Sequence, residues 1–470
     1  MFDRALFLTL IVVLLFCEAE NSLLSNIAES TRQWMDDITK LPIVQQVSKV
    51  SGDVMSQTTD VLTKLPLAVA RSLDLDEIKF PMFISDSNVV ELTDQIINEF
   101  NVGLDNKDIT LNMNDLVTKY GYPIERHQVT TKDGYVLSMY RIPNNGSVVF
   151  LMHGLLGSSD DFVVAGPESG LAYLLSTEGY DVWMGNSRGN KHSRQHLILD
   201  PSQSAFWDFS WHEIGCYDLP AMIDYVLQAT KTNKLKYVGH SQGTTSFFVM
   251  ASEKPEYNSK ISLMVALSPV AFMTHVKSPL VKLLAPGTPL AHSMMQSLGV
   301  SEVLPHNLAS RILRRVLCGI GPMAEIICSN LIFLFIGFDF GQLNVTNLPV
   351  LYSHIPSGAS VKQFAHYGQG VVSGDFRKFD YGDVKNLDLY GSNVPPSYNL
   401  ENIIAPVSIF YSEADWFTDP RDVHKLYRRL GNVIELYKVP YDHFSHLDFI
   451  IAKDFKTLIY SRLRKLLRDV

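Results

Sequence analysis

Two segments of the sequence match the pattern G-x-S-x-G, which places a serine between two glycines. They are Gly185-Asn-Ser187-Arg-Gly189 and Gly239-His-Ser241-Gln-Gly243. Where this pattern forms a nucleophile elbow, a tight turn between a strand and a helix pushes the serine hydroxyl out of the sheet. The chemistry would be nucleophilic attack by a serine that a nearby base activates.

Only the second match has the sequence context of an elbow. Leu235-Lys-Tyr-Val238 precedes it as a short strand, and the mostly apolar run after Gly243 predicts a buried helix. The first match is followed by a polar and charged run, which predicts a surface loop after a strand. We therefore predict that Ser241 is the nucleophile, and Ser187 is the less favoured alternative.

The acid and the base of a serine triad follow the nucleophile in this order in the chain. After the apolar run Val407–Tyr411 comes Asp415, which the end of a strand would deliver to the site. Glu413 is a weaker rival. Asp419 is followed by a proline, so it is better read as a helix N-cap.

Two histidines could serve as the base. His443 and His446 both follow the last predicted strand, and His446 stands at the start of the last predicted helix. Spacing favours His446 but leaves His443 open as a solvated turn residue. His153 is a third histidine near the site, and its His-Gly context is typical of a residue that shapes a turn.

Acyl transfer also needs main-chain N–H donors for the developing oxyanion. One comes from the residue after the nucleophile and one from the loop after an early strand. These positions are Gln242 and Leu155, the latter in His153-Gly-Leu-Leu-Gly157.

The elements that must position these residues alternate between strands and helices. Such alternation predicts a mostly parallel sheet with helices on both faces. We expect a hairpin of two strands around Asp133-Gly134. Six further strands are expected at Val148–Met152, Tyr180–Met184, Leu235–Val238, Ile261–Leu267, Val407–Tyr411 and Ile434–Val439.

A long insertion interrupts this alternation. About 130 residues, 272–402, separate two consecutive strands where a single crossover helix would suffice, which predicts an inserted, largely helical cap or lid. The sheet domain would thus consist of residues 109–271 and 403–470. The apolar run Ile326–Phe338 in the cap is too short for a membrane span, so we interpret it as a buried helix or the wall of an apolar pocket.

A dense set of motifs runs along the chain between about residues 109 and 463. They are Tyr120-Gly-Tyr-Pro123, Asp133-Gly-Tyr135, His153-Gly-Leu-Leu156, Asn186-Ser-Arg-Gly-Asn190, Tyr217-Asp-Leu-Pro-Ala221, Gly239-His-Ser-Gln-Gly243, Asp415 to Pro420 and His446-Leu-Asp-Phe449. Together they resemble the acid lipase family of gastric and lysosomal lipases. The resemblance implies an α/β-hydrolase fold and hydrolysis of neutral lipid esters (triacylglycerol or cholesteryl ester) under a mobile lid. It also implies Ser241, Asp415 and His446 as the triad and the N–H groups of Leu155 and Gln242 as the oxyanion donors. We expect no cofactor.

The N-terminus predicts export. Arg4 and the neutral run to Phe16 are followed by Cys17-Glu-Ala19, so we interpret residues 1–19 as a cleaved signal peptide. Residues 20–108 are longer than the family usually carries, and form either a prosegment or docking element, or an extension without ordered structure. Two glycosylation sequons, at Asn145 and Asn344, are compatible with secretion or a lysosomal destination.

After signal cleavage three cysteines remain, so at most one intramolecular disulfide can form. Cys318 and Cys328 are the natural pair, and the family resemblance implies the same bridge in the cap. Cys216 is then expected to be a buried free thiol. No CxxC motif or His/Cys cluster suggests a metal.

Composition excludes several classes of function. The chain has 470 residues, 46% of them hydrophobic, and its net charge is −9, so nucleic acid is an unfavoured partner.

Motifs weigh against other classes of protein. A Rossmann dehydrogenase would need G-x-G-x-x-G where this chain has His153-Gly-Leu-Leu-Gly-Ser158. A catalytically silent lipid-binding protein is disfavoured by the complete triad, whereas an acyltransferase that uses another acceptor than water stays open. Oligomeric state is not predicted.

Overall fold

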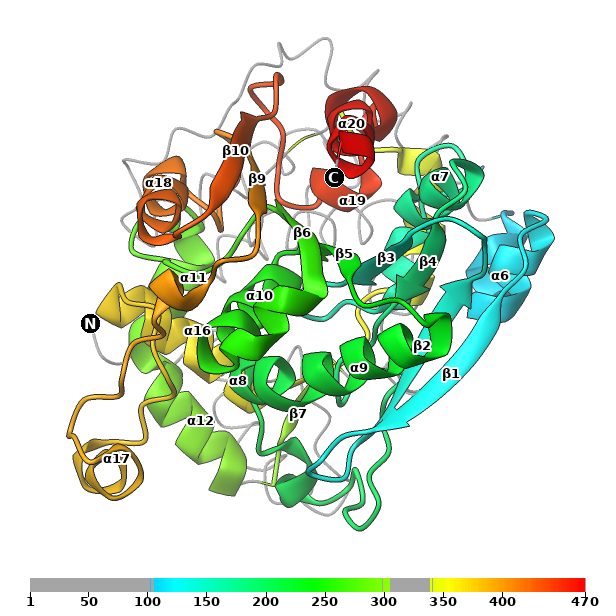
Figure 1. The fold of residues 1–470 in the computed structure, drawn as a ribbon. Helices are drawn as coiled ribbons and strands as arrows, with labels where there is room; N and C mark the ends of the chain where they lie inside the picture. Colours follow the sequence, from blue (N-terminus) through cyan, green and yellow to red (C-terminus); the bar gives the residue numbers. More distant parts are fainter. Residues whose placement is uncertain (1–101, 103–104, 298, 305–338, 340, 470) are drawn as a thin grey trace, which may run out of the picture. The chain divides into compact units, whose positions relative to one another are not determined.

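The computed structural model describes residues 102, 105–297, 299–304, 339 and 341–469. Within them lies an eight-stranded sheet with the strand order β1-β2-β4-β3-β5-β6-β9-β10 (Figure 1). The first two strands form an antiparallel hairpin and β2 is antiparallel to β4, while the other neighbours are parallel. The strands are β1 (Glu125–Thr130), β2 (Val136–Ile142), β3 (Val148–Met152), β4 (Asp181–Met184), β5 (Leu235–His240), β6 (Ile261–Leu267), β9 (Val407–Tyr411) and β10 (Val433–Lys438).

The central strands are apolar because both faces of the sheet are covered. Every residue of β3 is buried, and its side chains alternate between two cores. Phe150 packs in the core that includes α9 and α10, whereas Val149 and Leu151 pack in the core that includes α7 and α20 (Figure 1). The helices of the sheet domain are α6 (Met113–Lys119), α7 (Leu171–Thr177), α8 (Trp211–Glu213), α9 (Leu219–Thr230), α10 (Gln242–Glu253), α18 (Pro420–Arg429), α19 (Asp448–Ile451) and α20 (Ser461–Asp469).

The described residues between β6 and β9 are largely helical, as predicted for the cap. They also contain a small antiparallel pair, β7 (Glu302–Val303) and β8 (Ala359–Ser360), which the sequence did not predict. The apolar run 326–338 lies outside the described residues, and the boundaries of the cap stay a prediction. The helices here are α11 (Pro279–Leu284), α12 (Thr288–Ser297), α15 (Leu348–His354), α16 (Val361–Ser373) and α17 (Asp383–Tyr390).

The strand predictions are accurate where the apolar runs are sharply bounded. Strands β3, β6 and β9 begin and end at the predicted residues, and β10 begins one residue earlier than predicted. Because β3, β5, β6 and β9 run parallel, their carboxyl ends meet at the same edge of the sheet. The loops at this edge carry the predicted site residues.

Candidate active site

Ser241 lies in a strained turn between β5 and α10. Its backbone has φ 51° and ψ −118°, an unfavourable conformation for a residue with a side chain. The two glycines of the motif are required by space: a Cβ at Gly243 would lie 2.3 Å from the main-chain oxygen of Met152, and one at Gly239 would lie 2.9 Å from the carbonyl carbon of Gly243. The second G-x-S-x-G match therefore has the strand–turn–helix geometry that a nucleophile elbow needs.

The structure brings Ser241, His446 and Asp415 together. The Nε2 atom of His446 is 2.8 Å from Ser241 Oγ, and its Nδ1 atom is 2.9 Å from Asp415 Oδ2. Asp415 is fully buried. Burial alone would raise the pKa of Asp415, but the neighbouring His446, together with hydrogen bonds from His446, Ser268 and Thr418, lowers it below its usual range. The carboxyl group is thus held as an anion beside the imidazole.

The alternative acids and bases lie elsewhere. Glu413 is half exposed and pairs with Lys438 at 3.0 Å. Asp419 caps α18 by accepting a hydrogen bond from the N–H of Arg421. His443 is exposed, whereas His446 is buried just before α19 and not, as predicted, at the start of the last helix. Geometry therefore favours Asp415 and His446.

The two predicted oxyanion donors both lie close to Ser241. Gln242 is the first residue of α10, and Leu155 follows Gly154, where a Cβ would be only 3.1 Å from the Cβ of Ser241. No acceptor among the described residues is bonded to the main-chain N–H of Leu155 or Gln242. Both donors are thus free to bind an oxygen of a substrate at Ser241.

The first G-x-S-x-G match is itself buried, with Ser187 at 4% and Arg188 at 2% exposure. The polar run after it, residues 190–196, was predicted as a surface loop, and it is a loop that is only partly exposed. Arg188 lies between Asp133 and Asp218, with contacts of 2.6 and 2.7 Å, and its guanidinium stacks on Tyr135. A charged residue such as Arg188 normally indicates an exposed segment. Here its charge is paired with two carboxylates that are distant in the chain.

Sequence reasoning missed Ser268, which contacts both Asp415 and His446. It is the first residue after β6, and its hydroxyl donates to Asp415 Oδ2 at 2.5 Å and lies 2.8 Å from Nδ1 of His446. Its backbone also has a positive φ of 50°. The available signal was its position, because a serine directly after a buried strand lies at the same sheet edge as Ser241 and Asp415.

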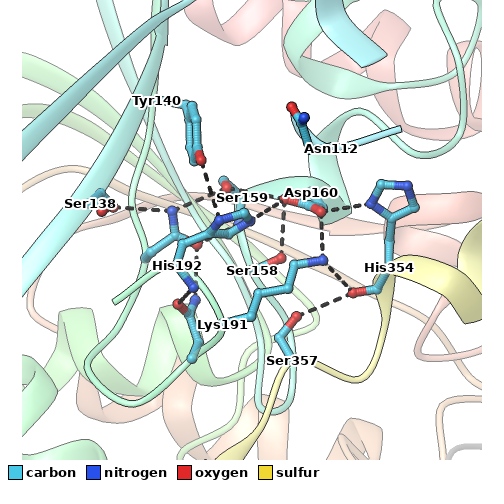
Figure 2. Close-up of polar contacts among 12 residues, drawn as sticks. Asn112, Ser138, Tyr140, Ser158, Ser159, Asp160, Lys191, His192, His354 and Ser357 are labelled. Atoms are coloured by element: carbon cyan, nitrogen blue, oxygen red, sulfur yellow. Dashed lines mark hydrogen bonds and ion pairs between the residues drawn. The ribbon is translucent and has the colours of Figure 1, made fainter. Parts of the chain in front are cut away.

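A second missed group surrounds Asp160, on the loop that carries Leu155. Figure 2 shows the side chains of Lys191, His192 and His354 converging on its carboxylate. The distances are 2.6 Å from Lys191 Nζ, 2.7 Å from His192 Nε2 and 2.7 Å from His354 Nδ1. Burial would raise the pKa of Asp160, but the charges of Lys191 and His192 hold it well below its usual range. This cluster joins the loop after β3 to the loop after β4 and to the cap.

Several other sequence predictions fall on surface or undescribed residues. Asn145 and Asn344 are both exposed, and Cys216 is a free, partly buried thiol. The Cys318–Cys328 pair, the signal peptide 1–19 and the extension up to residue 101 lie outside the described residues.

The described residues lack two further features. In the described ranges no three His, Cys, Asp or Glu side chains are grouped to hold a metal ion. No helix in this part of the chain has the length and apolarity needed to cross a membrane.

Comparison with known proteins decides the family. Residues 113–166 match a partial α/β-hydrolase lipase region, and residues 147–286 match the α/β-hydrolase fold. Lipase 1 of Drosophila melanogaster is 42% identical over 366 residues, which cover 77% of this chain and 81% of the relative. Gastric triacylglycerol lipase of Bos taurus is 38% identical over 375 residues, which cover 77% and 93%. The chain belongs to the acid lipase family.

As a member of this family, the protein is a lipase, a carboxylic ester hydrolase. Its predicted fold class is confirmed as well. A crystal structure of a protein from Sulfolobus solfataricus has a TM-score of 0.51 at 12% identity and covers 74% of this chain and 94% of its own. At that identity the likeness shows the α/β-hydrolase fold alone.

Proposed function

We propose that this lipase cleaves neutral lipid esters with Ser241 as nucleophile, His446 as base and Asp415 as the residue that orients His446. Ser241 Oγ attacks the ester carbonyl carbon while His446 Nε2 takes the hydroxyl proton. The tetrahedral oxyanion is held by the N–H groups of Leu155 and Gln242. The C–O bond of the ester then breaks, and His446 passes its proton to the departing alcohol.

Water completes the reaction on the acyl-enzyme. The oxygen of a water molecule attacks the acyl carbon while His446 takes a proton from that water. His446 then gives this proton to Ser241 Oγ as the bond to the acyl group breaks and the fatty acid leaves. Asp415 stabilises the positive imidazole that forms in each half of the cycle. The single observation that carries this proposal is the continuous contact from Ser241 Oγ through His446 to Asp415, at 2.8 and 2.9 Å.

We propose triacylglycerol as the first substrate and cholesteryl ester as the second. The support is the name of the gastric triacylglycerol lipases, which are 37–38% identical to this chain in Bos taurus and Homo sapiens. The apolar run 326–338 of the cap suits a long acyl chain. Burying six methylenes contributes about 5 kcal/mol, enough to select long-chain over short-chain esters.

We also propose that the protein enters the secretory pathway, with a secreted or lysosomal destination. The N-terminal run to Phe16 supports a signal peptide, and the exposed Asn145 and Asn344 are accessible for glycosylation. Cys318 and Cys328 would pair in that oxidising environment and leave Cys216 as the free thiol.

The test is release of fatty acid from emulsified triolein and cholesteryl oleate between pH 4 and pH 8. The full chain is compared with Ser241→Ala and with the control Ser246→Ala. Ser246 lies on α10, and its buried hydroxyl has no hydrogen-bond partner in the described part of the chain, so its removal should keep both fold and activity. Activity that survives in folded Ser241→Ala would refute the triad.

A further inference from the structure

His153 lies between β3 and the oxyanion donor Leu155, and its ring is buried. Its Nδ1 atom is 2.7 Å from the main-chain oxygen of Gly154. Its Nε2 atom lies 3.1 Å from the main-chain nitrogen of Ser187 and 3.2 Å from Nδ2 of Asn190. Both ring nitrogens are thus engaged, one by the oxyanion loop and the other by the first G-x-S-x-G segment.

These partners allow only one arrangement of protons on the ring. A main-chain carbonyl can only accept a hydrogen bond, so Nδ1 must carry the proton that Gly154 accepts. A main-chain N–H can only donate, so Nε2 must be the unprotonated acceptor for Ser187. His153 is therefore a neutral imidazole in the Nδ1–H form. Burial, the largest influence, lowers its pKa to about 4, in agreement with this form.

The hydrogen bond to Gly154 has a consequence for Leu155. The Gly154 carbonyl and the Leu155 N–H belong to one planar peptide unit, in which they point in opposite directions. Holding the carbonyl toward His153 therefore aims the N–H away from it. The N–H of Gly157 donates to the same oxygen at 3.1 Å, so the carbonyl is held from two sides.

We propose that His153 is a positioning residue that aims the Leu155 N–H at the oxyanion. The Ser187–Asn190 loop keeps His153 in the one tautomer that can do this. The first G-x-S-x-G match would then serve catalysis through the main-chain N–H of Ser187, together with the adjacent Asn190, without supplying a nucleophile. This inference rests on the proposed function, because it assumes that Leu155 binds the oxyanion formed at Ser241.

The test replaces His153 by residues that retain different parts of the ring. Asn can place an amide N–H near the Nδ1 position, Gln places its amide near Nε2, and Ala has neither. The matched control is His366→Asn: His366 is also buried and bonded to a main-chain oxygen, that of Arg377 at 3.0 Å, on α16 in the cap. Activity is measured on a soluble short-chain ester, which avoids effects of the lipid surface.

We expect His153→Ala to lower kcat about 100-fold with little change in KM, because one oxyanion donor is misdirected. His153→Asn should recover most of this loss and His153→Gln little of it. Inhibition by a trifluoromethyl ketone, which forms a tetrahedral adduct on Ser241, should weaken by the same factor as kcat/KM falls. His366→Asn should change the thermal midpoint but not kcat.

Three results would overturn the inference. They are an unchanged kcat in His153→Ala, a loss of kcat without weaker inhibition by the ketone, and equal recovery by Asn and Gln. If the Ala variant fails to fold, the comparison of Asn with Gln still decides. The proposed function is tested separately, because activity in Ser241→Ala would refute it whatever His153 does.

Discussion

Removal of the Ser268 hydroxyl is the perturbation that the structure specifies most sharply outside the triad. This hydroxyl donates to Asp415 Oδ2 at 2.5 Å, on the same oxygen that accepts from His446. Asp415 also accepts main-chain hydrogen bonds on Oδ1 from Phe417 and Thr418, at 2.8 and 3.0 Å. Loss of Ser268 therefore leaves the carboxylate bonded but holds Oδ2 through His446 alone.

The expected magnitude follows from the loss of one hydrogen bond to a buried charge. Such bonds contribute about 1.5–3 kcal/mol, and the remaining donors on Asp415 favour the lower value. If this hydrogen bond stabilises the transition state by about 1.5 kcal/mol, its removal lowers kcat roughly tenfold. KM should stay the same, because Ser268 acts through Asp415 and His446.

The assay separates the hydroxyl from the backbone of Ser268. Ser268→Ala removes the hydroxyl and keeps the positive φ of 50°, while Ser268→Gly also relieves the backbone strain. Both should lose kcat equally on a soluble ester, although Gly should have the higher thermal midpoint. Wild-type kcat in both folded variants would refute the reasoning, as would a loss in one variant alone.

Three further predictions concern stability. Burial raises the pKa of Asp161 to about 7, so the protonated carboxyl group contributes fully to folding stability below about pH 4, and this contribution is lost as the pH rises toward 7. Asp161→Asn should therefore raise the urea midpoint more at pH 7.5 than at pH 4.5. Equal gains at the two pH values would contradict this prediction. Gly243→Ala should abolish activity and lower the thermal midpoint, because its Cβ would lie 2.3 Å from Met152 O. Arg188→Met should cost about 3–5 kcal/mol in urea unfolding, since it leaves the buried Asp218 unpaired; a cost below 1 kcal/mol would argue against a buried ion pair.

Much of the sheet, and the position of Ser241 in a tight turn between a strand and a helix, could be predicted from the sequence. Strands such as β3 and β6 are runs of apolar residues with defined ends, because a strand covered on both faces has no polar side. Ser241 became the candidate nucleophile through its local context, since an elbow needs a strand, two glycines and a helix within a few residues. Asp415 followed from the rule that parallel strands deliver loops to one edge.

Tertiary structure alone decided how polar residues are used. Spacing left His443 open beside His446, and only the fold buries one and exposes the other. The loop at Arg188 has the composition of a surface segment, yet its charges are paired inside the protein with Asp133 and Asp218. A polar side chain is stable inside only when partners satisfy it, and these partners come from a turn and a helical segment that are distant in the sequence.

The same reason explains why the supporting residues were missed. Ser268 acts on Asp415 from a different strand, and Asp160 meets His354 across 194 positions of the chain. Apolar periodicity records which face of an element is buried, and so it survives in a local window of sequence. A hydrogen bond between two loops depends on which strands are neighbours in the sheet. A local window of sequence does not contain this information.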